Sequence, residues 1–281
     1  MRSVEPLEPL EALFDRAVGP ELPLGPLARF YGPLRRKSPT ARPLVLSNFV
    51  TSLDGVVSLG RPGTGGRDIS GDSREDRGLM GLLRATADVV IVGAGTLRAF
   101  PRHVWTPEAI YAPMASEYSA VRVGLGKSRA PVNVVVTASG DVDPALPVFA
   151  SGRAPAILVT TADGARRLAA RGARDLDIRV AGRGPSLDAG QILGALSVGA
   201  KETILLECGP QLMGTFLEAR AVDELFLTLA PQIVGRTPGS GREGLVAGVL
   251  FLPDRPIWTD LVSVRKIGNV LFLRYQLSTQ E

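Results

Sequence analysis

The sequence has few of the side chains that most often carry covalent or metal chemistry. Its 281 residues include one cysteine, Cys208, and one histidine, His103. This excludes a disulfide within the chain and a zinc or iron–sulfur site built from cysteine and histidine. Cys–His dyads are removed as a catalytic option, and a Ser–His–Asp triad would need His103 itself. His103 stands in an irregular proline-rich stretch, which favours a solvated loop residue. The chemistry is therefore expected to come from an organic cofactor, carboxylates or a carboxylate-bound metal.

Long apolar runs, aromatic residues and clustered charges are also scarce. No segment approaches the roughly 20 apolar residues of a membrane span, and acidic residues interrupt the apolar N-terminal stretch, unlike in a secretory signal. We therefore expect a cytoplasmic protein with no membrane partner. The net charge is +4 and the isoelectric point about 9.6. Because the basic residues are scattered and aromatics make up only 5%, no nucleic-acid partner is expected. A mild positive field suits a phosphorylated cofactor or substrate.

The first 41 residues differ from the rest of the chain. Leu7, Leu10, Leu13 and Phe14 recur at helical spacing, which predicts a short amphipathic helix ending near Val18. Prolines and the polar run RRKSPTARP follow. We therefore divide the chain into an N-terminal helical extension and linker (1–41) and one domain (42–281).

The domain alternates buried-strand patterns with helical ones. Helices are expected from Asp72 or Ser73 to residue 85, and over 163–172, 189–199 and 209–220. Strands are expected within 43–55, 87–96, 132–136, 156–160, 177–182, 202–207 and 222–235, with a hairpin over 261–277 turning at Gly268 and Asn269. This order predicts an α/β fold with a mainly parallel mixed sheet, helices on both faces and a C-terminal antiparallel hairpin. Residues 98–131 show no clear period and are expected to form an excursion near the site.

The strongest local pattern is ETILLECGPQLMGTFLEA, in which a buried strand ends at Glu207 and a helix begins at once. Gly209 and Pro210 open that helix, whose free N–H groups and positive dipole end suit a phosphate or pyrophosphate. A turn glycine with no binding role explains this segment, taken alone, as well. The candidate cofactor contacts here are the seven residues from 209 to 215, namely Gly209, Pro210, Gln211, Leu212, Met213, Gly214 and Thr215.

Three further strand ends offer polar groups. The run IVGAGT places Gly93, Gly95 and Thr96 at the carboxyl edge of the sheet, where α/β proteins bind ligands. Thr137 and Ser139 could meet an adenosine 2′-phosphate or cap a turn. Asp54, in SLDG, precedes a glycine-rich loop that suits either a mobile flap or an idle surface loop. A GxGxxG motif is missing after every expected strand, which excludes the standard dinucleotide fold.

Together, FVTSLDG (49–55), ISGDSREDRGLMGLLRATADVVIVGAGT (69–96) and LLECGPQLMGTFLEARAVDELFLTLAPQIVG (205–235) resemble the reductase domain of the bifunctional riboflavin-biosynthesis deaminase–reductase. The resemblance covers roughly residues 42–277 and implies a three-layer, dihydrofolate-reductase-like fold, NADPH as cofactor and a homodimer. It also implies cofactor contacts by Arg84, Thr96 and residues 209–215, and a substrate contact by Glu207. The family's deaminase half, with its metal-binding residues, is missing from this sequence.

The sequence departs from the family pattern at the expected substrate site. Asn48 replaces the lysine before SLDG, and Ala99–His103 replaces an acidic motif. Arg102 is a candidate for the substrate phosphate, and the change favours a substrate other than the family's. We expect NADPH-dependent reduction without a metal, with hydride transfer to a pyrimidine- or pterin-type substrate. Glu207, and more weakly Asp54, orient the substrate or a proton; each could instead be a purely structural carboxylate.

Three alternatives stay open at this point. One is a dihydrofolate-reductase-like activity, and another is a deazaflavin-dependent reductase. The third is a non-catalytic nucleotide-binding protein that kept the fold and lost the substrate site.

Overall fold

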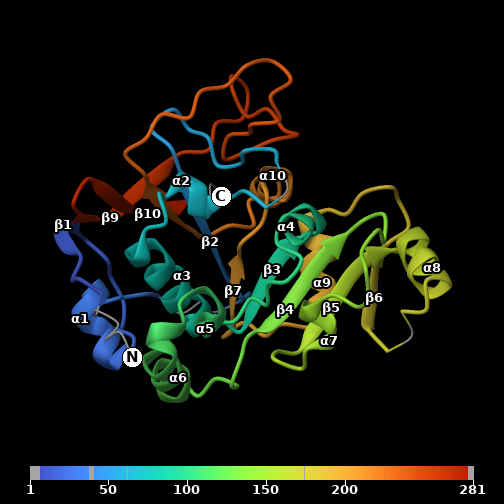
Figure 1. Cartoon of the computed structure of the whole chain (residues 1–281), viewed down its shortest axis with the longest axis horizontal. Coiled ribbons are helices and arrows are strands. Elements are labelled where there is room, and N and C mark those ends of the chain that lie inside the picture. The colour runs from blue at the N-terminus through green and yellow to red at the C-terminus, as the bar shows by residue number, and fades with distance from the viewer. Residues whose placement is uncertain (1–6, 38–40, 62, 174, 278–281) are drawn as a thin grey trace.

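Ten strands form one continuous mixed sheet in the computed structural model, which describes residues 7–37, 41–61, 63–173 and 175–277. Their order is β1-β9-β10-β8-β2-β7-β3-β4-β5-β6 (Figure 1). The strands are β1 (Glu11–Asp15), β2 (Leu44–Thr51), β3 (Val89–Gly93), β4 (Val132–Thr137), β5 (Ala156–Thr161), β6 (Asp177–Gly182), β7 (Thr203–Leu206), β8 (Glu224–Leu229), β9 (Thr259–Ile267) and β10 (Val270–Leu277). From β8 to β6 all neighbours pair in parallel, and β1, β9 and β10 add antiparallel strands at one edge.

Helices cover both faces of this sheet. They are α1 (Ala28–Tyr31), α2 (Gly66–Ile69), α3 (Arg74–Thr86), α4 (Ala94–Ala99), α5 (Pro107–Ile110), α6 (Ala115–Gly124), α7 (Pro147–Ala150), α8 (Ala162–Ala170), α9 (Ala189–Leu196) and α10 (Pro210–Glu218). One apolar core lies under α1, α3, α6 and α8, and a second lies under α9 and α10. The predicted α/β fold class, with a mainly parallel mixed sheet between helices and a C-terminal antiparallel hairpin, is confirmed. Within the described residues, no helix has the length and apolar character that crossing a membrane requires.

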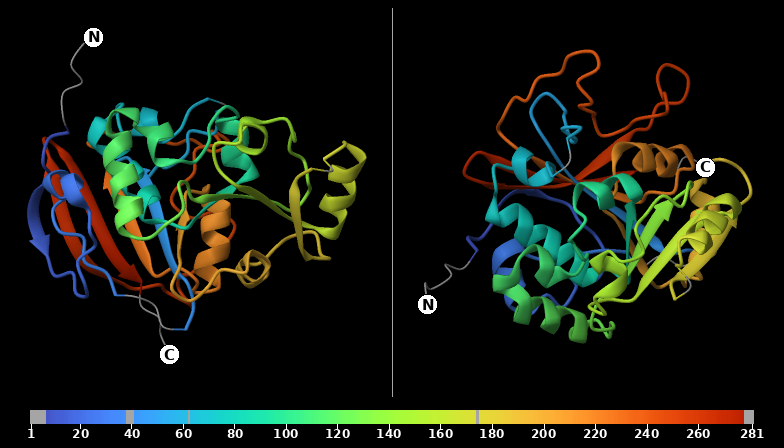
Figure 2. Two further views of the ribbon diagram at one scale, coloured as in Figure 1. Left: turned by 90° about the horizontal axis from the view of Figure 1, so that it is seen from below. Right: turned by 45° about the vertical axis from the view of Figure 1, so that its right-hand side comes forward.

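The helix predicted from residue 7 to Val18 is wrong. Residues 11–15 form β1, an edge strand that pairs antiparallel with β9, and Figure 2 shows the blue N-terminal segment beside the red C-terminal strands. Leu7 and Leu10 are buried, whereas Leu13 and Phe14 are 51% and 42% exposed, so the four residues do not form one buried helical face. Pairing with β9 satisfies backbone groups at the sheet edge, and this tertiary gain outweighs a weak local preference.

The segment between β1 and β2 packs into the main core. Its buried apolar residues are Leu24, Leu27, Phe30, Tyr31 and Leu34. The Arg265 side chain of β9 binds it as well, because its Nε donates to the Tyr31 carbonyl at 2.6 Å and its Nη2 contacts Asp15 at 2.8 Å. These contacts tie residues of the predicted extension to the sheet.

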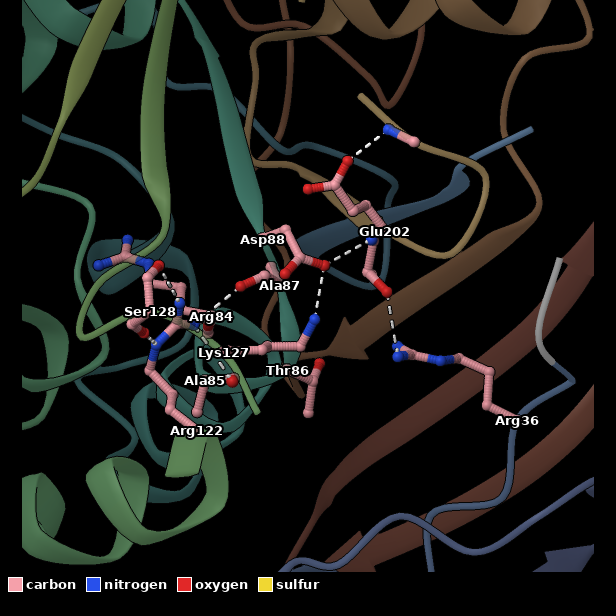
Figure 3. A network of polar contacts seen from close by, with 12 residues as sticks. Arg36, Arg84, Ala85, Thr86, Ala87, Asp88, Arg122, Lys127, Ser128 and Glu202 are labelled. Atoms are coloured by element: carbon pink, nitrogen blue, oxygen red, sulfur yellow. Dashed lines mark hydrogen bonds and ion pairs between the residues drawn. The ribbon is translucent and has the colours of Figure 1, made fainter. Parts of the chain in front are cut away.

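A polar network closes the amino-terminal ends of β3 and β7 (Figure 3). The Nη1 of Arg122, on α6, donates to the carbonyls of Arg84, Ala85 and Ala87 at the end of α3, at 3.1, 3.3 and 2.8 Å. The Asp88 carboxylate accepts from Lys127 Nζ at 2.5 Å and from the Thr203 amide at 2.8 Å. This end of the sheet is therefore occupied by structural contacts, and the predicted site residues lie at the opposite, carboxyl end.

Candidate functional site

Two helices begin side by side at the carboxyl ends of β3 and β7. Gly93 precedes α4 and Gly209 precedes α10, and neither helix start has a side-chain cap. The strands are neighbours in the sheet, and the Glu207 amide donates to the Ile91 carbonyl at 3.0 Å. We call residues 93–96 and 209–211 the paired turns. Uncapped helix starts present free N–H groups and a positive dipole end, which favour an anion.

The glycines of the paired turns keep the space between them open. A Cβ added at Gly209 would lie 4.0 Å from the Thr96 Oγ1, and one at Gly93 would lie 3.7 Å from Leu212. Gly95 is exposed, and no described heavy atom lies within 4 Å of the position its Cβ would take. Side chains larger than hydrogen at Gly93 and Gly209 would therefore lie between the two turns.

The predicted segment from 209 to 215 is not uniformly accessible. Gln211 is exposed and Leu212 is half-buried, whereas Met213 is fully buried in the core. A Cβ at Gly214 would lie 2.5 Å from the Ala247 carbonyl, so this glycine permits close packing against the loop at 246–249, not against the sheet. The Thr215 hydroxyl donates to the Gln211 carbonyl at 3.2 Å. Only Gly209, Pro210 and Gln211 belong to the paired turns.

Glu207 and Arg84 form a buried, two-pronged ion pair between the end of β7 and α3. The Arg84 Nε lies 2.8 Å from Glu207 Oε1, and its Nη2 lies 2.6 Å from Oε2. The Nη1 of Arg84 contacts His103 Nε2 at 2.9 Å and the Thr106 carbonyl at 3.0 Å. The side chains are 1% and 6% exposed. All three guanidinium nitrogens thus have protein partners. Arg84 therefore fixes Glu207, and each of its nitrogens is already engaged by the protein and not directed at the paired turns.

The expectation of a solvated His103 is wrong. This residue is half-buried, contacts Arg84 and packs edge-on against Trp105 with ring centroids 5.1 Å apart. Burial and the Arg84 charge lower its pKa to about 3. Because a guanidinium can only donate, Nε2 is the acceptor and the neutral ring carries its proton on Nδ1. A proline-rich sequence gives no sign of such a contact.

Thr137 and Ser139 organise the turn after β4. The buried Thr137 hydroxyl accepts from the Gly140 amide at 3.2 Å, and the Ser139 hydroxyl accepts from the Asp141 amide at 3.2 Å. Of the two roles considered for Thr137 and Ser139, these contacts match the capping of a turn. Ser139 is exposed and Thr137 is buried, so only Ser139 presents itself to a ligand at the surface.

Asp54 ties two loops together. Its carboxylate accepts from the Ser52 hydroxyl at 2.6 Å and from the amides of Val234 and Gly235 at 3.1 and 2.8 Å. These hydrogen bonds, that of Ser52 first, lower its pKa to about 2. The glycine-rich loop after it is further attached by a bridge between Ser58 and Glu243. The geometry of Asp54 is that of a structural carboxylate.

Asn48 and Arg102 lie in different surroundings. Asn48 is 9% exposed on β2, opposite Phe226 of β8, and so lies on the sheet face that α3 covers. Arg102 is exposed on the loop after α4, where the described part of the chain gives its side chain no hydrogen-bond partner. Asn48 is therefore near Glu207 in the sheet, while Arg102 is free to meet a ligand.

The pattern of α3 holds a further residue that the sequence reasoning missed. Asp76, Leu79 and Leu83 share one helical face by their i, i+3, i+7 spacing, and all three are buried. A carboxylate on the apolar face of a predicted helix is a signal that the sequence alone contains.

Within the described residues, no group of three or more Asp, Glu, His or Cys side chains could hold a metal ion.

Comparison with solved structures shows several relatives of this fold. A pyrimidine reductase-like protein from Corynebacterium diphtheriae is 23% identical, with 85% of this chain and 93% of that chain covered and a TM-score of 0.64. A deaminase/5-amino-6-(5-phosphoribosylamino)uracil reductase from Thermotoga maritima is 18% identical over 84% of this chain and 57% of that one, with a TM-score of 0.59. The riboflavin biosynthesis reductase of Saccharomyces cerevisiae is 16% identical over 86% and 93%, with a TM-score of 0.57.

No curated protein matches the chain. A family model described as the RibD C-terminal domain matches residues 43–273. That range contains the paired turns, the Arg84–Glu207 ion pair and every strand except β1 and the end of β10. The chain therefore belongs to the RibD C-terminal domain family.

Proposed function

We propose that this protein is an NADPH-dependent reductase that acts on a pyrimidine- or pterin-type heterocycle. Its family contains reductases of riboflavin biosynthesis, and one relative by fold is a 5-amino-6-(5-phosphoribosylamino)uracil reductase. The observation that carries the proposal is the pair of uncapped helix starts directly beside a buried Arg84–Glu207 ion pair. An anion-binding turn next to an oriented carboxylate suits a dinucleotide whose reactive ring meets a polar substrate.

In this proposal the paired turns hold the dinucleotide phosphates. The amides after Gly93 and Gly209, the Thr96 hydroxyl and the exposed Gln211 are the donors, and Ser139 is a candidate for the 2′-phosphate. The bound cofactor supplies a hydride. Arg84 acts as a positioning residue, because its guanidinium fixes the Glu207 carboxylate at the end of β7. Asn48 and Arg102 are the candidate substrate contacts.

Filling the gap at Gly95 tests the cofactor site. A leucine side chain there meets no described protein atom at its Cβ, and it raises helix propensity. We expect Gly95→Leu to weaken NADPH binding at least about tenfold, or about 1.4 kcal/mol, in isothermal titration calorimetry. Gly194→Leu, on the exposed side of α9 and equally free of contacts, is the matched control and should keep the wild-type affinity.

The same titration separates the rival functions. Heat with NADPH and steady oxidation in the presence of an aminopyrimidine or pterin supports the proposal. Binding of a deazaflavin in its place, or NADPH binding without turnover of any such substrate, contradicts it.

Glu207 is proposed to orient the substrate through hydrogen bonds. Glu207→Gln keeps the shape but removes the charge, so we expect turnover to fall by about 10² or more while NADPH affinity changes less than about twofold. Because Arg84 loses its buried counter-ion, the variant should also be less stable by about 3 kcal/mol. Glu218→Gln, from an exposed ion pair with Arg255, is the control. Lost NADPH affinity with unchanged turnover per bound cofactor contradicts this role.

We further propose that the enzyme is cytoplasmic and homodimeric. Exposed apolar side chains near β1 support a second copy as partner, namely Leu13, Phe14 and Val18.

A further inference from the structure

Asp76 is a buried carboxyl group for which the structure gives no ion pair in the described part of the chain. It occupies the first turn of α3, where its amide donates to the Ser73 hydroxyl at 3.1 Å. It is 4% exposed. A buried carboxylate without a paired cation is costly, so such a group tends to take up a proton. This separates Asp76 from the structural carboxylates of the molecule, which are paired or bonded to amides.

Asp76 belongs to a strip of polar groups between α3 and the carboxyl end of the sheet. Phe226 lies in the core under α3 and pairs with Asn48, and Val50 pairs with Thr228 two positions on. Because side chains alternate along strands, Asn48 and Thr228 face α3. Leu205 lies in the same core, so Glu207, two residues later, faces α3 as well. Three neighbouring strands thus present polar side chains toward this helix, in the order β8, β2 and β7.

One hydroxyl in this strip lies against Asp76. The buried Thr228 Oγ1 makes no hydrogen bond of ordinary geometry to a described residue, but it acts on Asp76 as a hydrogen-bonding neighbour that lowers the pKa of that carboxyl. Buried polar atoms are normally satisfied, and each exception asks for an explanation. Asp76 is the polar neighbour of this hydroxyl, so the two side chains form one buried polar pair that faces the sheet.

The two carboxyl groups of the strip are in opposite electrostatic situations. Both oxygens of Glu207 accept from Arg84, so this carboxylate is paired with a buried cation. Burial, followed by the nearby Glu207 charge, raises the pKa of Asp76 to about 6, against the opposing effects of Thr228, Arg77 and Ser70. Among the described residues, Glu207 and Arg77 are the charges that act on it; on the neighbouring helices, Glu108 of α5 is exposed and the Tyr118 hydroxyl of α6 is bonded to the Gly78 carbonyl. Two carboxyl groups in such different surroundings, one paired with a cation and one not, are a mark of acid–base chemistry.

We propose that Asp76 is the catalytic acid of this reductase, delivering the proton that accompanies hydride transfer, while Glu207, paired with Arg84, orients the substrate. This rests on the proposed function. The substrate's carbon–heteroatom double bond accepts the hydride at carbon and the proton at nitrogen or oxygen. The O–H bond of Asp76 breaks as the new N–H or O–H bond forms. The nicotinamide ring is oxidised by two electrons, and solvent returns a proton to Asp76.

The pH dependence of turnover tests this role. With NADPH and an aminopyrimidine or pterin substrate, wild-type kcat should fall about tenfold per pH unit above the pKa of Asp76. Asp76→Asn should lower kcat by about 10²–10⁴ and abolish this limb, with NADPH affinity unchanged. Asp72→Asn makes the same chemical change four residues away, at an exposed ion-paired position with φ of 61° that asparagine tolerates, and should keep the wild-type profile. An unchanged limb in Asp76→Asn overturns the proposal.

A second measurement does not depend on turnover. Infrared difference spectra of the wild-type protein across about pH 6 should show a protonated buried carboxyl band that Asp76→Asn lacks. Glu207→Gln removes the neighbouring negative charge, so the band should then disappear at lower pH. A spectrum without the band at pH 5 overturns the assignment even if a variant fails to fold. If the wild-type protein does not bind NADPH, the proposed function is refuted. The infrared band would then still show whether the Asp76 carboxyl group is protonated.

Discussion

At the scale of single residues, Arg84 determines how charge is distributed in the buried cluster. A guanidinium taken out of water is costly unless its donors are satisfied, and here Glu207, His103 and the Thr106 carbonyl satisfy all three nitrogens. The cluster is neutral only if His103 is uncharged. Its ionisation is therefore set by Arg84, and the sole histidine of the chain becomes a direct probe of the arrangement.

The His103 ring should not titrate in the folded protein at ordinary pH. Its pKa of about 3 compares with about 6.5 for an unperturbed histidine. We expect nitrogen-15 NMR to show one imidazole, neutral and protonated on Nδ1, from neutral pH down to about pH 4. In denaturant the same signal should titrate near pH 6.5. A folded-state midpoint close to the denatured one would show that the contact with Arg84 is not formed.

The pKa shifts of His103 and Asp76 make the free energy of unfolding depend on pH in opposite directions. The unfolded chain protonates His103 more readily than the folded one, so this group costs stability as pH falls from about 6.5 toward about 3. Asp76, with its raised pKa, contributes stability that is complete below about pH 4 and is lost as pH rises through about 6. In chemical denaturation, the His103→Gln variant should therefore lose less stability on acidification than the wild type does.

At the scale of elements, the sequence predicted what is local. The start of α3 was readable because Ser73 caps it from within the same turn, and the parallel strands were readable from their short apolar runs. The end of α3 was not readable in this way. Its last carbonyls are bound by Arg122, which lies 35–38 residues away, and no local pattern encodes such a contact.

The candidate site also has a part that local sequence predicted and a part that depends on contacts distant in sequence. The paired turns follow from glycines directly after apolar runs, so sequence reasoning located Gly93, Gly95 and Gly209. The pairing of Arg84 with Glu207 spans 123 residues. The family resemblance assigned these two side chains to different ligands, and only the fold brings them together. The helix expected near residue 10 failed for a related reason, because an edge position beside β9 decided its structure.

At the scale of the whole molecule, the residues before β2 are part of the folded unit. Leu27, Phe30 and Leu34 are at most 3% exposed and belong to the same core as Leu82 and Leu83 of α3. Gly78 of α3 marks the same contact, since a Cβ there would lie 2.4 Å from Leu7. The core under α3 that supports Asp76 and Arg84 is therefore completed by this segment.

Truncating Leu27 measures that contribution. If the segment is integral, Leu27→Ala should cost about 2–5 kcal/mol, the range for a fully buried leucine, and match Leu83→Ala in the last turn of α3. Leu13→Ala, at a position 51% exposed on β1, should change stability by no more than about 0.5 kcal/mol. Urea denaturation at constant m-value is the measurement. If Leu27→Ala proves as stable as Leu13→Ala, the core is stable without this segment. The first 41 residues would then be an extension that contributes little to the free energy of unfolding.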